Sequence, residues 1–116
     1  MLFRSVCFEP TPSHFKLLQQ LTSDFKNIEN VEAAISTQDA PITFYTEPAN
    51  TTMNSLVYRG GEFFIVKGLK LESIIKNYNL QNVDFVKMDI EGSEKIVLND
   101  ETLEYIANNV PKILIE

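Results

Sequence analysis

The sequence has few of the residues that build reactive or metal-binding sites. Its 116 residues include one cysteine, Cys7, and one histidine, His14. A single cysteine excludes an intramolecular disulfide, which fits a reducing compartment, and we expect a cytoplasmic protein. A single histidine disfavours a zinc site and gives little basis for a Ser-His-Asp triad. We therefore predict no resident metal site built on histidine or cysteine.

Long apolar runs and runs of like charge are also missing. No segment approaches the about 20 apolar residues of a membrane span, and no block of like charges marks a binding tail. The formal net charge is −6, from 16 acidic and 10 basic residues, so the surface repels phosphate backbones. We expect neither a membrane nor a nucleic acid as partner. The length and the 44% hydrophobic content indicate a single globular domain over residues 1–116.

Predicted strands and helices alternate along the chain, which is typical of the α/β class. Residues 4–9 read as a short buried strand that Pro10 ends. Thr11 is a candidate N-cap, and apolar residues at helical spacing predict a helix over 12–26. A strand over 31–35 follows a turn. This order and length predict a parallel βαβ unit.

The remainder of the chain continues the alternation. We predict strands at residues 42–46, 62–67, 83–88 and 112–116, and helices at 71–78, from about Ser93, and at 101–108. The polar residues 47–55 predict a loop, and Gly60-Gly61 predicts a turn.

Glu9 is the first candidate functional residue. It stands at the carboxyl end of the first predicted strand, and ligands of open α/β sheets bind outside the carboxyl ends of strands. A carboxylate there can accept hydrogen bonds from both hydroxyls of a ribose. A surface glutamate that favours the dipole of the following helix explains the same position, and both interpretations stay open.

The second candidate group follows the strand over 83–88. If that strand persists, its period of two places Lys87, Asp89 and Glu91 on one side. A lysine beside two carboxylates keeps them ionised and can position a hydroxyl for deprotonation. Gly92 allows a sharp turn and close approach of a ligand. These charges at the end of a buried strand favour a functional site.

Two other interpretations of this segment remain. Ser93 as N-cap and Glu94 in the first helical turn describe an ordinary capped turn between a strand and a helix. The carboxylates can also hold Mg²⁺, which one or two carboxylates often bind together with waters and substrate.

Six segments, taken in order, resemble the FkbM family of S-adenosylmethionine-dependent methyltransferases. The family pattern has Phe-Glu-Pro at a strand end, Ala-hydrophobic-Ser, a strand pair with a serine-containing loop, Leu-acidic-Ser at a helix start, Lys-x-Asp-x-Glu-Gly-x-Glu, and a last apolar strand. The matching segments are Phe8-Glu9-Pro10, Ala34-Ile35-Ser36, 42–55, Leu71-Glu72-Ser73, 83–94 and Ile113-Leu114-Ile115-Glu116.

The resemblance implies a Rossmann-like class I methyltransferase fold with S-adenosylmethionine as cofactor. The implied reaction transfers a methyl group to a hydroxyl oxygen of a small molecule or a glycan. Glu9 would bind the cofactor ribose, and Ala34 lies in a second cofactor-binding segment. Asp89 would face the substrate or the methionine end of the cofactor, supported by Lys87 and Glu91.

The match departs from the family pattern at both ends. The family begins with a central strand and a glycine-rich loop, whereas the four glycines here lie at positions 60, 61, 68 and 92. We therefore expect a truncated domain without the first central strand and the last strands, and a second chain is a candidate to complete the sheet. A different nucleotide-binding enzyme, such as a dehydrogenase, and a non-catalytic module that pairs through an open sheet edge are the alternatives.

Overall fold

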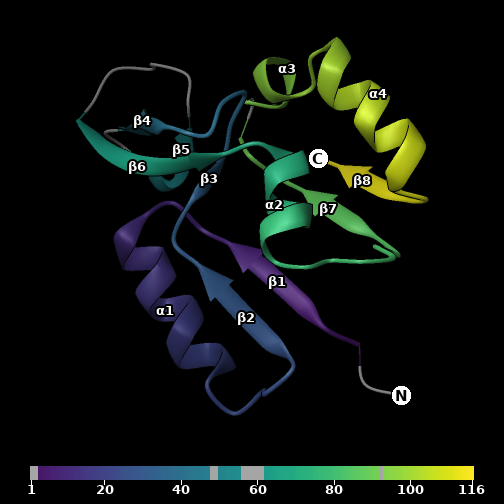
Figure 1. The fold of residues 1–116 in the computed structure, drawn as a ribbon. Coiled ribbons are helices and arrows are strands. Elements are labelled where there is room, and N and C mark those ends of the chain that lie inside the picture. Colours follow the sequence, from purple (N-terminus) through teal and green to yellow (C-terminus); the bar gives the residue numbers. More distant parts are fainter. Residues whose placement is uncertain (1–2, 48–49, 56–61, 92) are drawn as a thin grey trace.

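A computed structural model of the chain describes residues 3–47, 50–55, 62–91 and 93–116. Helices and strands alternate along these residues, so the α/β class is confirmed (Figure 1). The strands are β1 (Ser5–Phe8), β2 (Ile28–Val31), β3 (Ala34–Ile35), β4 (Pro41–Glu47), β5 (Asn50–Ser55), β6 (Phe63–Leu69), β7 (Val86–Met88) and β8 (Ile113–Ile115). The helices are α1 (Pro12–Thr22), α2 (Leu71–Asn77), α3 (Glu94–Val97) and α4 (Asp100–Asn109).

The described strands form three separate sheets. β1 pairs with β2 in parallel, and β7 pairs with β8 in parallel. The third sheet has the order β3-β6-β4-β5, in which only the β3–β6 pair is parallel. The β1-α1-β2 segment is a parallel βαβ unit as predicted, but its second strand is Ile28–Val31, and Ala34–Ile35 of the predicted strand 31–35 pair with β6 instead.

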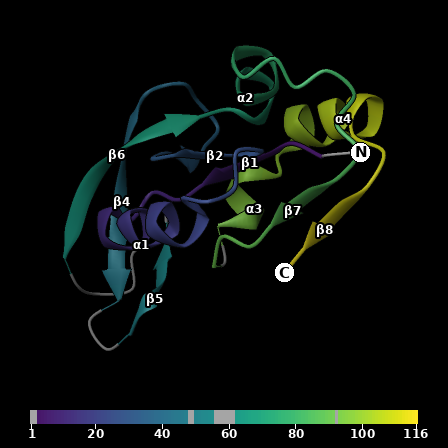
Figure 2. The same cartoon turned by 90° about the horizontal axis from the view of Figure 1, so that it is seen from below.

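The two parallel pairs run in the same direction. The arrowheads of β1, β2, β7 and β8 all point toward the β3–β6 side of the molecule in Figure 1. In Figure 2, α2 and α4 lie on one side of these strands and α1 lies on the other. The carboxyl ends of all four strands therefore point to the same side of the molecule, and ligands of open α/β sheets bind outside the carboxyl ends of their strands.

Helix α2 joins the two parallel pairs through neighbouring side chains. Ile74 is 3% exposed and packs in a cluster that includes Phe8 of β1. Ile75, the next residue, belongs to a second cluster that contains Val86 of β7 and Ile106 of α4. A third cluster fills the interior of the mixed sheet. The core is thus divided into three parts, and α2 connects two of them.

Several predicted boundaries differ from the structure. Residues 50–55 form strand β5, although a loop was predicted. Their polar sequence has no apolar alternation, and the strand forms through backbone pairing with β4. α1 ends at Thr22, four residues before the predicted end, and β2 starts within the predicted turn. β7 pairs over the three residues Val86–Met88, so it ends where predicted and starts three residues later. The predicted Gly60-Gly61 turn lies outside the described residues.

A carboxylate distant in sequence holds the start of α2. Oδ1 of Asp39 accepts a hydrogen bond from the Lys70 backbone N–H at 2.9 Å, and its Oδ2 accepts one from the Ser73 hydroxyl at 2.5 Å. The Ser73 hydrogen bond, followed by that of Lys70, lowers the pKa of Asp39 below its ordinary value. The Leu71-Glu72-Ser73 segment thus has a structural role in fixing the helix start.

We expect Asp39→Asn to be less stable than the wild type at neutral pH, and the difference to shrink in acid. The pKa of Asp39 is lower in the folded chain than in the unfolded chain. The ionised carboxylate therefore stabilises the fold at pH values above the unfolded-state pKa, and this contribution is lost as the pH falls through the folded-state pKa. Urea midpoints measured from neutral pH to below the ordinary pKa of 3.8 check this. Asp24→Asn serves as the control, because Asp24 is also an exposed carboxylate. If the stability of Asp39→Asn depended on pH in the same way as that of the wild type, the stabilising role of the Asp39 carboxylate would be contradicted.

None of the helices in the described part of the chain is long and apolar enough to span a membrane.

Candidate functional site

Glu9 follows β1 at its carboxyl end, as predicted. Its Oε1 accepts a hydrogen bond from the Thr11 backbone N–H at 2.8 Å and lies 3.9 Å from His14 Nδ1, beyond hydrogen-bond distance. The Thr11 side chain makes no capping bond to the helix, so the Glu9 carboxylate serves the helix start instead. The glutamate side chain is 29% exposed. Both interpretations of Glu9 therefore remain compatible, since one oxygen supports α1 and the side chain stays partly exposed.

The half-buried Cys7 precedes this site on β1. Burial raises the pKa of its thiol above the ordinary value, which favours the neutral thiol over the nucleophilic thiolate. Cys7 therefore acts as a small packing residue of the strand.

Asp89 follows β7 at its carboxyl end. Its side chain is exposed, and the hydrogen bonds and ion pairs found among the described residues do not occupy it. Glu9 follows β1 and Asp89 follows β7, and these two strands point to the same side of the molecule (Figure 1). The structure thus brings a partly engaged carboxylate and an exposed one to one edge, after two different strands.

The turn after Asp89 has a special backbone geometry. Glu91 has a φ of 52°, a left-handed conformation that costs a residue with a side chain about 1–2 kcal/mol. Glu94 Oε1 accepts a hydrogen bond from the Ile90 backbone N–H at 2.8 Å, and the Ile90 carbonyl accepts one from Ser93 N–H. Glu94 therefore ties the turn to α3. Strained backbone held in this way is frequent at functional sites.

The condition for placing Lys87, Asp89 and Glu91 on one side is not met, because β7 ends at Met88 and the period of two does not extend to Asp89 and Glu91. Lys87 Nζ lies 3.2 Å from Glu116 Oε2 on the neighbouring strand end. Its side chain is 51% exposed, so this pair is a weak surface contact and leaves Asp89 outside it. The predicted stabilisation of Asp89 by Lys87 is thus not seen in this conformation.

Ala34 is 5% exposed and packs with Phe44 and Val66 inside the mixed sheet. Its methyl group therefore faces protein, and any contact with a cofactor would have to come from its backbone. Its assignment to the cofactor site stays a prediction.

Two interactions at this edge were not predicted from the sequence. The partner of Lys87, Glu116, is 29 positions away in the sequence, and only the β7–β8 register shows that they meet. The contact from Glu94 back to Ile90 could have been found from the local sequence, since an acidic residue at a helix start often accepts a backbone N–H.

Within the described residues, no group of histidine, cysteine and acidic side chains is placed to hold a metal ion.

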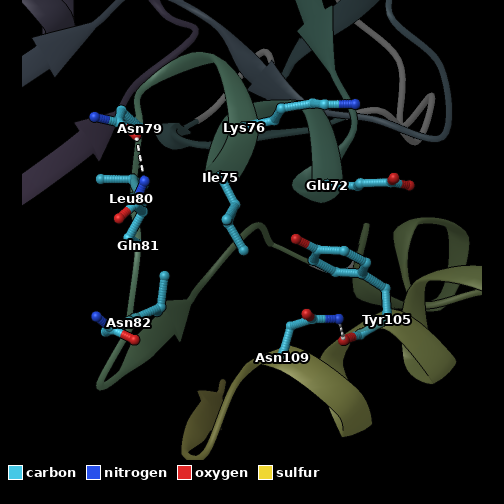
Figure 3. Close-up of a pocket in the computed structure, with 10 residues that line it drawn as sticks. Glu72, Ile75, Lys76, Asn79, Leu80, Gln81, Asn82, Tyr105 and Asn109 are labelled. Atoms are coloured by element: carbon cyan, nitrogen blue, oxygen red, sulfur yellow. Dashed lines mark hydrogen bonds between the residues drawn. The ribbon is translucent and has the colours of Figure 1, made fainter.

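A sizeable cavity lies elsewhere in the described part of the chain. It is a groove of about 430 Å³ between α2, the segment 79–83 and α4, into which Ile75, Tyr105 and Asn109 project (Figure 3). The segment 79–83 precedes β7, so the groove is at the amino end of that strand, opposite Asp89. The predicted site residues do not line the groove, and the position of the two carboxylates outweighs cavity size as a guide to the site.

A comparison with protein families identifies the domain. Residues 2–116 match the model of the methyltransferase FkbM domain. No curated protein sequence and no solved structure matches the chain significantly. The matched region covers the two strand ends, the strained turn and the α2 start described above. The chain therefore belongs to the methyltransferase FkbM domain family.

Proposed function

We propose that this domain transfers a methyl group from S-adenosylmethionine to a hydroxyl oxygen of a sugar or another natural product. The family match over residues 2–116 carries the proposal. The two carboxylates at the carboxyl ends of β1 and β7 support it, because that edge is where Rossmann-like sheets bind nucleotides. The single, half-buried cysteine supports a cytoplasmic location.

In this proposal Glu9 holds the ribose of the cofactor. Its Oε1 is engaged by the Thr11 N–H, which fixes the orientation of the carboxylate. Its other oxygen then accepts hydrogen bonds from the ribose hydroxyls. Charge-assisted bonds of this kind are about twice as strong as neutral ones. Backbone groups near Ala34 complete the cofactor side of the site.

Asp89 acts on the acceptor side. The acceptor oxygen attacks the methyl carbon, the bond from that carbon to sulfur breaks with its electron pair going to sulfur, and the acceptor proton passes to a base. The exposed Asp89 carboxylate is that base, or it orients the ammonium of the methionine part. Lys87 and Glu91 keep a supporting role in the proposal, for which the Lys87 side chain has to leave Glu116 when the reactants bind. Catalysis then comes mainly from holding the two reactants in line.

Isothermal titration tests the cofactor assignment. We expect S-adenosylmethionine and S-adenosylhomocysteine to bind the wild-type chain, and Glu9→Gln to weaken both by about tenfold or more, because the charge-assisted bonds to the ribose are lost. Glu104→Gln is the matched control, since Glu104 is exposed on α4 away from the strand ends.

Equal affinity of wild type and Glu9→Gln would remove Glu9 from the site. A titration with NADH separates the dehydrogenase alternative, and preferential binding of NADH would contradict the methyltransferase proposal.

A further inference from the structure

The groove between α2, the segment 79–83 and α4 has the size of a ligand site. Its volume of about 430 Å³ lies within the range of about 300–1,000 Å³ that is usual for small-molecule pockets. Ile75 projects into it from α2 and Tyr105 projects into it from α4 (Figure 3). The carboxylates of Glu9 and Asp89 do not line it. The groove is therefore separate from the candidate cofactor site at the strand ends.

The apolar part of the groove is held in place by the protein itself. Ile75 and Val83 are half-buried and pack against the buried cluster that α2 and α4 share. The Leu80 backbone N–H donates to the Ile75 carbonyl at 2.9 Å, which fixes the start of the segment 79–83 against α2. A groove that is formed before its ligand arrives binds at a lower entropic cost.

Amide side chains make up much of the polar lining. They belong to Asn79, Gln81, Asn82 and Asn109. Gln81 Nε2 donates to Asn79 Oδ1 at 3.2 Å, and Asn109 Nδ2 donates to the Tyr105 carbonyl at 2.9 Å. No hydrogen bond within the described part of the chain uses the side-chain oxygens of Gln81 and Asn109. These neutral amides can therefore both donate to a ligand and accept from it.

The Tyr105 hydroxyl is a further polar group that a ligand can use. It points into the groove, and the hydrogen bonds of the described residues do not engage it (Figure 3). Burial, followed by the nearby Glu72 carboxylate, raises the pKa of Tyr105, so the hydroxyl stays a neutral donor. The aromatic ring adds a flat apolar surface next to that hydroxyl.

The charges around the groove cancel. Its described lining has one acidic residue, Glu72, and one basic residue, Lys76. A site without net charge does not concentrate phosphates or carboxylates. Amides, a phenol and an apolar surface together suit a neutral ligand that carries many hydroxyl groups, because each hydroxyl both donates and accepts hydrogen bonds.

We propose that this groove binds a neutral oligosaccharide. The sugar hydroxyls bond to the amides and to the Tyr105 hydroxyl, and the C–H face of a sugar ring lies on the Tyr105 ring and Ile75. An extended peptide fits less well, because such peptides are recognised mainly through main-chain bonds to a strand edge, whereas side chains supply the polar groups here. This inference rests on the groove alone and does not depend on methyl transfer.

An NMR titration of the isotope-labelled chain tests the site with four disaccharides: cellobiose, lactose, maltose and N,N′-diacetylchitobiose. Each is added up to about 10 mM, which is tenfold above a Kd of about 1 mM. We expect at least one of them to shift the side-chain amide signals of Gln81 and Asn109 and the ring signals of Tyr105.

Three results of this titration would overturn the proposal. The first is the absence of shifts with all four disaccharides. The second is shifts in the groove with the peptide trialanine and with none of the sugars. The third is shifts confined to Glu9 and Asp89, which would place the sugar at the strand ends and would leave the proposed methyl transfer intact.

Substitutions on α4 isolate the contacts in the groove. Asn109→Ala removes an exposed amide, and Tyr105→Phe removes the hydroxyl while it keeps the ring. We expect each to weaken binding of the disaccharide by about threefold to tenfold, because a hydrogen bond is lost. Asn108→Ala is the matched control, since Asn108 is exposed on the same helix and does not line the groove. Equal affinity of all three folded variants would overturn the assignment, and circular dichroism verifies that they are folded.

Discussion

Replacing Ile74 with alanine is expected to lower the free energy of unfolding by about 2–5 kcal/mol. Ile74 is 3% exposed and packs with Ala33 and Leu69, next to Phe8 of β1. The substitution removes buried methyl groups and leaves a cavity where α2 meets the β1–β2 pair. Alanine has a higher helix propensity than isoleucine, but this difference offsets less than about 0.7 kcal/mol of the lost stability.

Urea unfolding measures the effect, and Ile96→Ala is the matched control. Ile96 is 45% exposed on α3, so its replacement should change the free energy of unfolding by about 0.5 kcal/mol or less. If the two variants lose the same stability, α2 does not join the two parallel pairs through a packed core, and the arrangement described for the site would lose its support.

Gly68→Ala is expected to lower the free energy of unfolding by about 1–3 kcal/mol. A Cβ at position 68 would lie 2.6 Å from the backbone oxygen of Ala40 and 3.0 Å from Cγ2 of Ile42. The same Ala40 oxygen accepts the Gly68 N–H at 3.0 Å, so it cannot move away without loss of that hydrogen bond. Because the obstacle is main chain, rotation of a side chain does not relieve the clash.

Lys67→Ala is the control for Gly68→Ala, since Lys67 is exposed on the same strand. We expect its unfolding midpoint to stay close to that of the wild type. Gly68 pairs with Ala34 across the β3–β6 ladder, so the glycine variant should also disturb the backbone around Ala34. An unchanged midpoint for Gly68→Ala would show that β3 and β6 do not approach as closely as described.

The order of elements could be predicted because it follows from local patterns. The proline after Glu9 and the helical spacing that begins at Phe15 mark the first strand and helix, and both are found near the predicted places. The placement of Glu9 and Asp89 at strand ends also follows from such boundaries. Local sequence is sufficient where one segment decides its own structure.

Features that depend on distant partners could not be predicted in the same way. Strand β5 forms because β4 supplies hydrogen-bond partners, and its own residues give no apolar alternation. Asp39 reaches Ser73 across 34 positions of sequence, and Lys87 meets Glu116 only because of the β7–β8 register. β7 starts at Val86, three residues after the predicted start, and it pairs only with Ile113–Ile115 of β8. Tertiary pairing decides each of these cases.

The location of the cofactor site is the central claim, and amide chemical-shift mapping with S-adenosylhomocysteine tests it most directly. NMR spectra of the labelled chain, recorded as the ligand is added, report weak as well as tight binding. The account predicts that the largest shifts occur at the backbone after β1, around Glu9, and after β7, around Asp89 and Ile90. Shifts confined to the groove around Tyr105 and Asn109, or none at all, would contradict it.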